Sequence, residues 1–278
     1  MTSTLDDLDH RVLARQVIVH GEPIPPWRWA VIVAVVASFL HDQSIARLGA
    51  PSFSEHLAAY AATLVPAPGA VRAWTLIQLT LVGYGIAQLL PSQRRVAVYD
   101  RLAGPVVLAS LVTVVQRASL SSESPQTTAL LSVVLAVVAG AAFVRAHAGI
   151  AHARRSAFSV YPTSRWIAAP IALLFGWSLV SAGATVDAAL AHALGPHVLL
   201  AAIGATTVTL ASRHRDPVMP ALVAWLLTSI CAGNIAPPAV ATAALVSAAA
   251  CAAIGIVIAT TRARPAASPS PSRRSHRA

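Results

Sequence analysis

The chain has 278 residues, of which 56% are hydrophobic and 11% are charged, and its formal net charge is +10. Because soluble domains are about one quarter charged, this composition excludes an ordinary soluble domain and predicts an all-α, polytopic membrane protein. The two cysteines, Cys231 and Cys251, lie in apolar stretches without a Cys-x-x-Cys motif. Neither a disulfide framework nor a zinc or redox motif is therefore predicted.

The chain begins with a polar segment of mixed charge, residues 1–26. It lacks the short basic start and immediate apolar run of a cleavable signal, so we expect a cytoplasmic N-terminal segment. Leu5, Leu8 and Val12 have helical spacing, which allows a short interfacial helix, and a mobile tail is the alternative.

Eight apolar segments follow, and they predict one transmembrane helical domain over residues 27–260. Their lengths are close to the ~20 residues that a helix needs to cross a ~30 Å hydrocarbon core. The predicted spans are Trp27–Ser44, Val71–Leu90, Leu102–Leu120, Thr127–His147, Trp166–Ala188, Pro196–Ser212, Pro217–Asn234 and Pro237–Thr260. The first outer loop contains SFSEHLAAYAATL, whose apolar residues predict a short surface helix.

The arginines predict the orientation of these spans. If the N-terminus is cytoplasmic, 17 of the 20 basic residues fall on the cytoplasmic side, and only Arg47, Arg72 and Arg117 fall outside. This positive-inside bias predicts eight spans with both termini cytoplasmic, and we expect the protein to be an integral, multi-pass protein of the plasma (cytoplasmic) membrane.

The last segment, residues 261–278, is basic and rich in proline and serine, which predicts a disordered cytoplasmic tail. Its arginines are suited to anionic lipid. We do not expect nucleic acid as a partner, because no aromatic residues interleave with the charges.

The predicted spans carry no ionisable residue near the membrane centre, where such residues mark proton or ion paths. Gln78 is the most deeply placed strongly polar side chain. His147 with His152, and His192 with His197, are five residues apart, which is off the i, i+4 face used by helical metal sites. We therefore expect interfacial histidines rather than a metal site.

The tryptophans fall into two groups. Three flank cytoplasmic span ends, where the aromatic belt explains them: Trp27, Trp29 and Trp166. Trp74 lies just inside the outer face, and Trp177 and Trp225 lie near mid-membrane. Two interpretations stay open for this second group: helix–helix packing, or the aromatic wall of a pocket for a flat apolar ligand.

The eighth predicted span carries small residues at four-residue spacing: Ala243, Ser247, Cys251 and Gly255. Small residues spaced in this way let helix backbones approach closely. The stripe is expected to pack on another span or on a second copy of the protein, as a homodimer.

Three stretches resemble one known family. PAPGAVRAWTLIQLTLVGYGIAQLLP, from Pro66, is similar to a signature of the tryptophan-rich sensory proteins, also called translocator proteins. In the longer bacterial members a later span resembles PIALLFGWSLVSAGAT, which keeps the spacing from Pro170 to Trp177. DPVMPALVAWLL, from Asp216, resembles the stretch that follows and supplies Trp225.

The resemblance implies a non-enzymatic membrane protein that binds a flat hydrophobic ligand, porphyrin-like or other, in an intramembrane aromatic pocket. Some polar positions differ from the family pattern: Gln78 stands where the family has a tyrosine, and Ser181 and Thr185 replace its alanine and asparagine. The implied ligand-binding set is Trp74, Gln78, Trp177, Ser181, Thr185 and Trp225.

Two other functions stay open. The first is a transporter or exporter of small amphiphilic molecules, for which the outer span ends offer a polar set: His41, Asp42, Gln43, Asp187 and Asn234. The second is a membrane enzyme that acts on a lipid or tetrapyrrole. It needs a general acid or a nucleophile, and only residues at span ends offer one.

Overall fold

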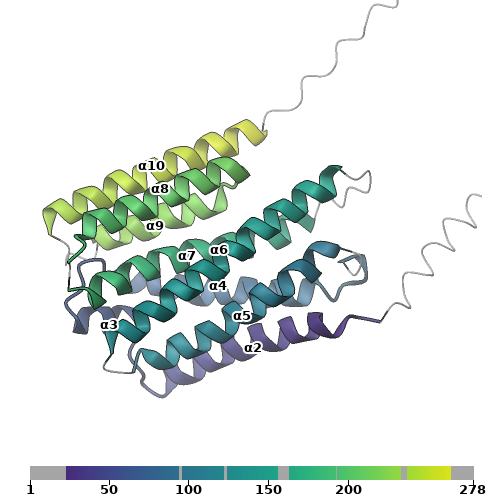
Figure 1. Cartoon of the computed structure of the whole chain (residues 1–278), viewed down its shortest axis with the longest axis horizontal. Helices are drawn as coiled ribbons and strands as arrows, with labels where there is room; N and C mark the ends of the chain where they lie inside the picture. Colours follow the sequence, from purple (N-terminus) through teal and green to yellow (C-terminus); the bar gives the residue numbers. More distant parts are fainter. Residues whose placement is uncertain are drawn as a thin grey trace, which may run out of the picture.

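The computed structural model describes residues 23–93, 96–121, 124–155, 163–191, 193–232 and 237–263, and these form a helical bundle without strands (Figure 1). Most of the N-terminal segment and the tail lie outside these residues. The helices are α2 (Pro26–Arg47), α3 (Phe53–Ala59), α4 (Pro68–Ala87), α5 (Ala97–Ser119), α6 (Pro125–Arg155), α7 (Thr163–Ala189), α8 (Pro196–His214), α9 (Val218–Ala232) and α10 (Pro238–Ala263), with a 3-10 turn η2 (Pro91–Gln93).

Each of the eight predicted segments forms a helix, and the short helix predicted in the first loop is α3. Six helices are long and apolar enough to cross a membrane: α2, α4, α5, α6, α7 and α10. The other two fall short for different reasons. The 15 residues of α9 span only about 22 Å at 1.5 Å per residue, and α8 carries three threonines and a serine.

Successive long helices run in opposite directions, so the bundle has two ends. We call the end that carries α3 the α3 end, and the opposite end the Arg28 end. Helix α2 begins and α10 ends at the Arg28 end (Figure 1). At the α3 end the N–H of Ala67, before α4, donates to the carbonyl of Ser229 in α9 at 3.2 Å.

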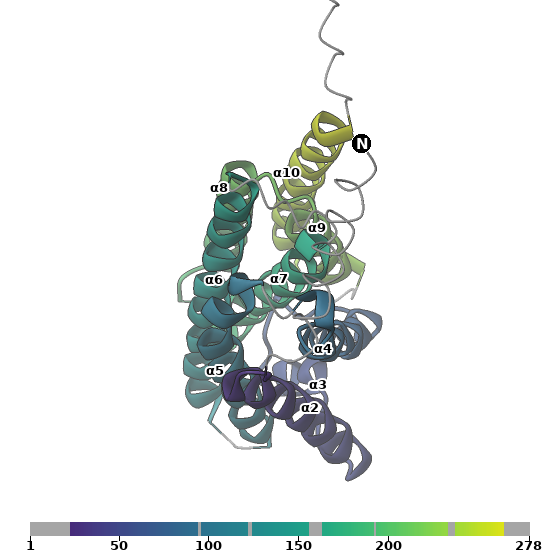
Figure 2. The ribbon, with the colours of Figure 1, turned by 90° about the vertical axis from the view of Figure 1, so that its right-hand side faces the viewer.

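Helix α7 lies in the middle of the bundle, between α4, α6, α8 and α9 (Figure 2). Of its membrane-spanning residues 78% are buried, a larger share than in the other candidate spans. Glycines allow the close packing: a Cβ on Gly176 would lie 3.3 Å from Val223 of α9, and a Cβ on Gly183 would lie 2.6 Å from Ile203 of α8. The stretch around Trp177 is thus in contact with most of the bundle.

The small-residue stripe of α10 packs against α8 and α9 of the same chain. Cys251 is fully buried, Ser247 lies beside Gly204 of α8, and Gly255 lies beside Pro220 of α9. The sequence left two partners open for this stripe, another span or a second copy of the protein. In the structure the stripe packs on other helices of the same chain.

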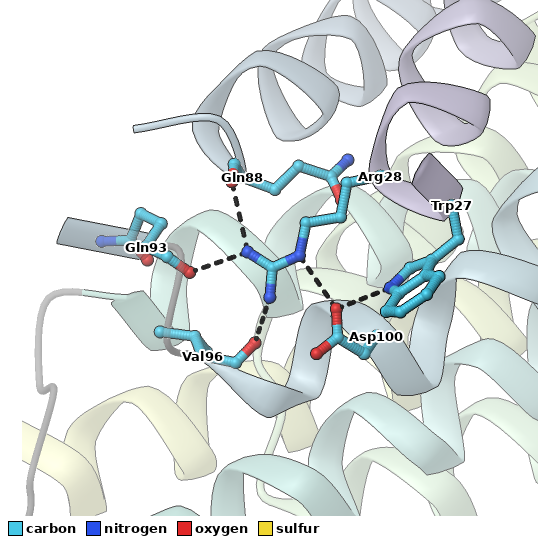
Figure 3. Close-up of polar contacts among 6 residues, drawn as sticks. All are labelled: Trp27, Arg28, Gln88, Gln93, Val96 and Asp100. Atoms are coloured by element: carbon cyan, nitrogen blue, oxygen red, sulfur yellow. Dashed lines mark hydrogen bonds and ion pairs between the residues drawn. The ribbon is translucent and has the colours of Figure 1, made fainter. Parts of the chain in front are cut away.

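A buried arginine joins three segments at the Arg28 end (Figure 3). Arg28 is 1% exposed, and its Nε–H donates to Asp100 Oδ1 at 2.9 Å. Its other N–H groups donate to the carbonyls of Gln88, Gln93 and Val96. The guanidinium therefore ties the start of α2 to the end of α4, to η2 and to the start of α5.

A buried carboxylate fixes the backbone before α4 at the α3 end. Asp187 Oδ2, near the end of α7, accepts hydrogen bonds from the N–H and hydroxyl of Thr63, each at 2.8 Å, and from the N–H of Leu64 at 3.3 Å. The first loop is thereby held against α7.

We expect Arg28→Leu to lower the free energy of unfolding by about 2–3 kcal/mol, because three carbonyls lose a donor and Asp100 keeps only the hydrogen bond from Trp27. Breaking a buried ion pair costs more, but Asp100 is 37% exposed and water screens part of the loss. Unfolding in mixed detergent micelles by SDS measures the change. The exposed Arg47→Leu on the same helix is the control, and equal losses in the two variants would contradict the assignment.

Candidate functional site

Two tryptophans expected from the sequence are in contact. The rings of Trp74 (α4) and Trp177 (α7) are stacked, with centroids 5.4 Å apart and planes at 28°. Phe53 of α3 lies on the same group, its ring 6.1 Å from that of Trp177. Three aromatic rings from three different helices thus form one cluster.

A cavity of about 360 Å³ opens beside this cluster. Residues from α2, the segment at α3, α4, α5 and α7 line it. Ligand pockets in proteins commonly measure about 300–1,000 Å³ and combine apolar walls with a few placed polar groups. Its aromatic and charged lining residues are Phe53, Trp74, Trp177, Asp42, Arg72 and Arg117.

An ion pair forms the polar side of the cavity. Arg117 Nε lies 2.9 Å from Asp42 Oδ1, both side chains are 11% exposed, and Arg117 also donates to the carbonyl of Pro51 at 2.6 Å. The sequence predicts that both residues lie at the outer ends of their spans, but it does not predict that they form a pair. No local pattern links them, because they lie on α2 and α5.

Gln116 lines the same cavity from α5 and donates from Nε2 to Ser132 Oγ of α6 at 2.6 Å. The hydrogen bond holds α5 and α6 together next to the cavity. The amide nitrogen of Gln116 is thus engaged in helix packing.

The position of Phe53 depends on how α3 is held. Ser52 accepts from the N–H of Glu55, and Glu55 accepts in turn from the N–H of Ser52, which is a capping box. His56 Nδ1 lies 2.8 Å from the carbonyl of Leu120, just after α5. Burial lowers the pKa of His56, opposed by this hydrogen bond, so the ring is neutral near pH 7 and donates through Nδ1.

Gln78 lies one helical turn beyond Trp74. Its side chain is 3% exposed, and neither Nε2 nor Oε1 has a hydrogen-bond partner in the protein. It faces a second, smaller hollow, which shares Trp74 and Thr113 with the large cavity. Buried amide groups nearly always have a partner.

The other residues of the expected set lie elsewhere. Ser181 and Thr185 are buried in α7, where the hydroxyl of Thr185 donates to the carbonyl of Ser181, and neither lines the described cavity. Trp225 is 46% exposed on α9 and is absent from the cavity lining as well. The structure brings Trp74, Trp177 and Gln78 to one region and leaves the other three apart from it.

A histidine cluster lies at the opposite end. His147 Nε2 is 3.0 Å from Asp216 Oδ2, and the His214 ring lies 5.1 Å from that of His147. Burial raises the pKa of Asp216, but hydrogen bonds from His147 and from the N–H groups of Met219 and Val218 outweigh it and hold the pKa below its usual value. In the described part of the chain no three His, Cys, Asp or Glu side chains are placed to hold a metal ion, and His192 lies outside it.

A scan against family models matches residues 26–258 to the family described as TSPO-like protein. The chain belongs to this family. The resemblance of its three motifs to translocator proteins is thereby confirmed, and the match runs from the start of α2 into α10. Neither the curated proteins nor the solved structures gave a match.

We predict that substitutions of Asp42 and Arg117 have strongly coupled effects on the stability of this TSPO-like protein. We expect Asp42→Leu and Arg117→Leu each to destabilise the bundle, because each leaves a buried charge unpaired. The double variant should lose less than the sum, with a coupling energy of about 1–3 kcal/mol. SDS unfolding of all four proteins measures it, and additive losses would show that the pair is not formed.

Proposed function

We propose that this TSPO-like membrane protein binds a flat hydrophobic ligand, porphyrin-like or other, in the cavity beside Trp74 and Trp177. The single observation that carries the proposal is the stacked pair of tryptophans at the wall of a cavity of about 360 Å³. An aromatic wall offers a flat ligand a large apolar contact at little entropic cost. Phe53 extends this wall from α3.

The polar groups of the cavity support a role in orienting the ligand. Arg117 and Asp42 are paired with each other, and Gln116 is bonded to Ser132. Side chains fixed in this way present a preorganised polar surface, which favours selective binding. We therefore propose a binding protein rather than an enzyme, with transport of an amphiphilic molecule as the alternative use of the same cavity.

We further propose eight membrane spans with both termini in the cytoplasm, in the plasma membrane of a bacterium. The alternating helix directions support this, since α2 begins and α10 finishes at one end of the bundle (Figure 1). The arginine bias supports the choice of side. The short α9 lies against α7 and α10, whose packing compensates for its length.

Titration with protoporphyrin tests the ligand site. We expect Trp74→Leu and Trp177→Leu to weaken binding about tenfold, because each removes part of the aromatic wall. Trp225→Leu is the matched control and should change the dissociation constant less than about twofold, since Trp225 lies outside the cavity. Absorbance of the porphyrin and quenching of the remaining tryptophans both report binding.

Equal weakening by all three substitutions, or no binding by the parent protein, would overturn the proposed site for this ligand. Flux measured in proteoliposomes separates the alternatives: binding without flux supports a receptor or sensor, and flux that depends on Trp177 supports a transporter.

A reporter fused after Ala278 tests the topology. Eight spans with a cytoplasmic N-terminus place this fusion in the cytoplasm. We expect alkaline phosphatase to be inactive and green fluorescent protein to be fluorescent at this position. The opposite pair of results would require an odd number of spans or the reverse orientation.

A further inference from the structure

The side chain of Gln78 has no partner among the protein atoms that surround it. The hollow that it faces has a mixed lining from α2, α4, α5 and α7. Aliphatic side chains such as Val35, Leu81 and Leu174 alternate there with the hydroxyl groups of Ser38, Ser110 and Thr113. A primary amide carries two N–H donors and one acceptor oxygen. Leaving such a group unpaired in an apolar interior is costly, so a partner for it is expected to come from the hollow.

Three hydroxyl side chains line the hollow: Ser38 of α2, and Ser110 and Thr113 of α5. The two on α5 are already engaged. Ser110 donates to the carbonyl of Val106 at 3.0 Å, and Thr113 donates to the carbonyl of Ala109 at 2.9 Å. Both bonds are internal to α5 and fix the hydroxyl hydrogens away from Gln78. These residues therefore offer no donor to the oxygen of Gln78.

The space at the amide is too small for a ring system, so only the polar atoms at the edge of a ring can reach it. Its free volume is about 10 Å³, roughly what one water molecule requires. The larger cavity adjoins it, because Trp74 and Thr113 line both. A ring system that lies in the larger cavity can therefore direct the polar atoms of one edge towards Gln78.

We propose that Gln78 selects flat ligands that carry a hydrogen-bond donor and an acceptor side by side on one edge, as a lactam does. The N–H of the lactam donates to Oε1 of Gln78, and its carbonyl accepts from Nε2. Both orphaned atoms of the side chain are then paired. The inference rests on the proposed function and adds the polar chemistry of the ligand.

Three flat tricyclic probes of nearly equal size test this. Phenanthridin-6(5H)-one has the donor–acceptor edge, its N-methyl derivative lacks the donor, and phenanthrene lacks both. The full-length protein in lipid nanodiscs is titrated with each probe, with tryptophan quenching as the readout and nanodiscs without protein as the blank.

We expect the parent protein to bind the free lactam about tenfold more tightly than the N-methyl derivative, because the methyl group leaves Oε1 unpaired. In Gln78→Leu and Gln78→Met the preference should fall below about twofold. Comparing these ratios between variants cancels the different partitioning of the probes into lipid. Gln126→Leu, which changes an exposed glutamine of α6 that lines neither the hollow nor the large cavity, should keep the tenfold preference.

The outcomes separate the two proposals. If phenanthrene binds and the parent shows no preference for the lactam, or if the preference survives in both Gln78 variants, the selection by Gln78 is wrong and the hydrophobic site stands. If none of the three probes quenches the tryptophans, the proposed function itself fails.

Discussion

The burial of α7 is the constraint on which the rest of this bundle depends. A helix with neighbours on four sides has no free face for bulky polar groups, and its close contacts need small residues. Gly176 and Gly183 meet this need against α9 and α8. Because α7 is fixed in this way, Trp177 is held at a defined depth, where α4 brings Trp74 onto its ring. The site is a consequence of the packing of one central helix.

Each end of this apolar bundle holds a largely buried arginine that is paired with an aspartate of the same chain. Arg28 pairs with Asp100 at one end, and Arg117 pairs with Asp42 at the other. Such pairs lower the cost of placing charge near or inside a membrane. Gln78 contrasts with them, since it is equally buried and has no protein partner. The Gln88 amide at the Arg28 end is also buried without a partner. The role in recognition that we propose for Gln78 rests in addition on the hollow that it faces next to Trp74.

Family membership concerns the helical domain as a whole, whereas the chemistry of the ligand site depends on the side chains that line it. The TSPO-like match covers residues 26–258 and thus the helical domain. It says little about the polar lining, where Gln78, Gln116 and Arg117 are properties of this sequence. The flat hydrophobic ligand that we propose agrees with what the family resemblance implies, whereas the polar selection proposed at Gln78 is argued from this chain's own side chains.

The sequence alone determined which segments are helices, because apolar runs of about 20 residues have few other ways to satisfy their backbone in lipid. It also determined the family, through the spacing from Pro170 to Trp177 and its companions, and it gave Trp74, Gln78 and Trp177 as candidates. Its seventh predicted span, Pro217–Asn234, contains α9, which has 15 described residues.

Only the tertiary structure decided which candidates lie together. Trp177 and Trp225 look alike along the chain, yet one is 6% exposed and the other 46%. Periodicity gives the faces of a helix but not the neighbour that each face meets, so it cannot tell a cavity wall from an outer surface. Tertiary packing also decided two other contacts: the pairing of Asp42 with Arg117, and the contact of Phe53 with Trp177. Each joins segments far apart in sequence, and such contacts are set by how the helices pack around α7.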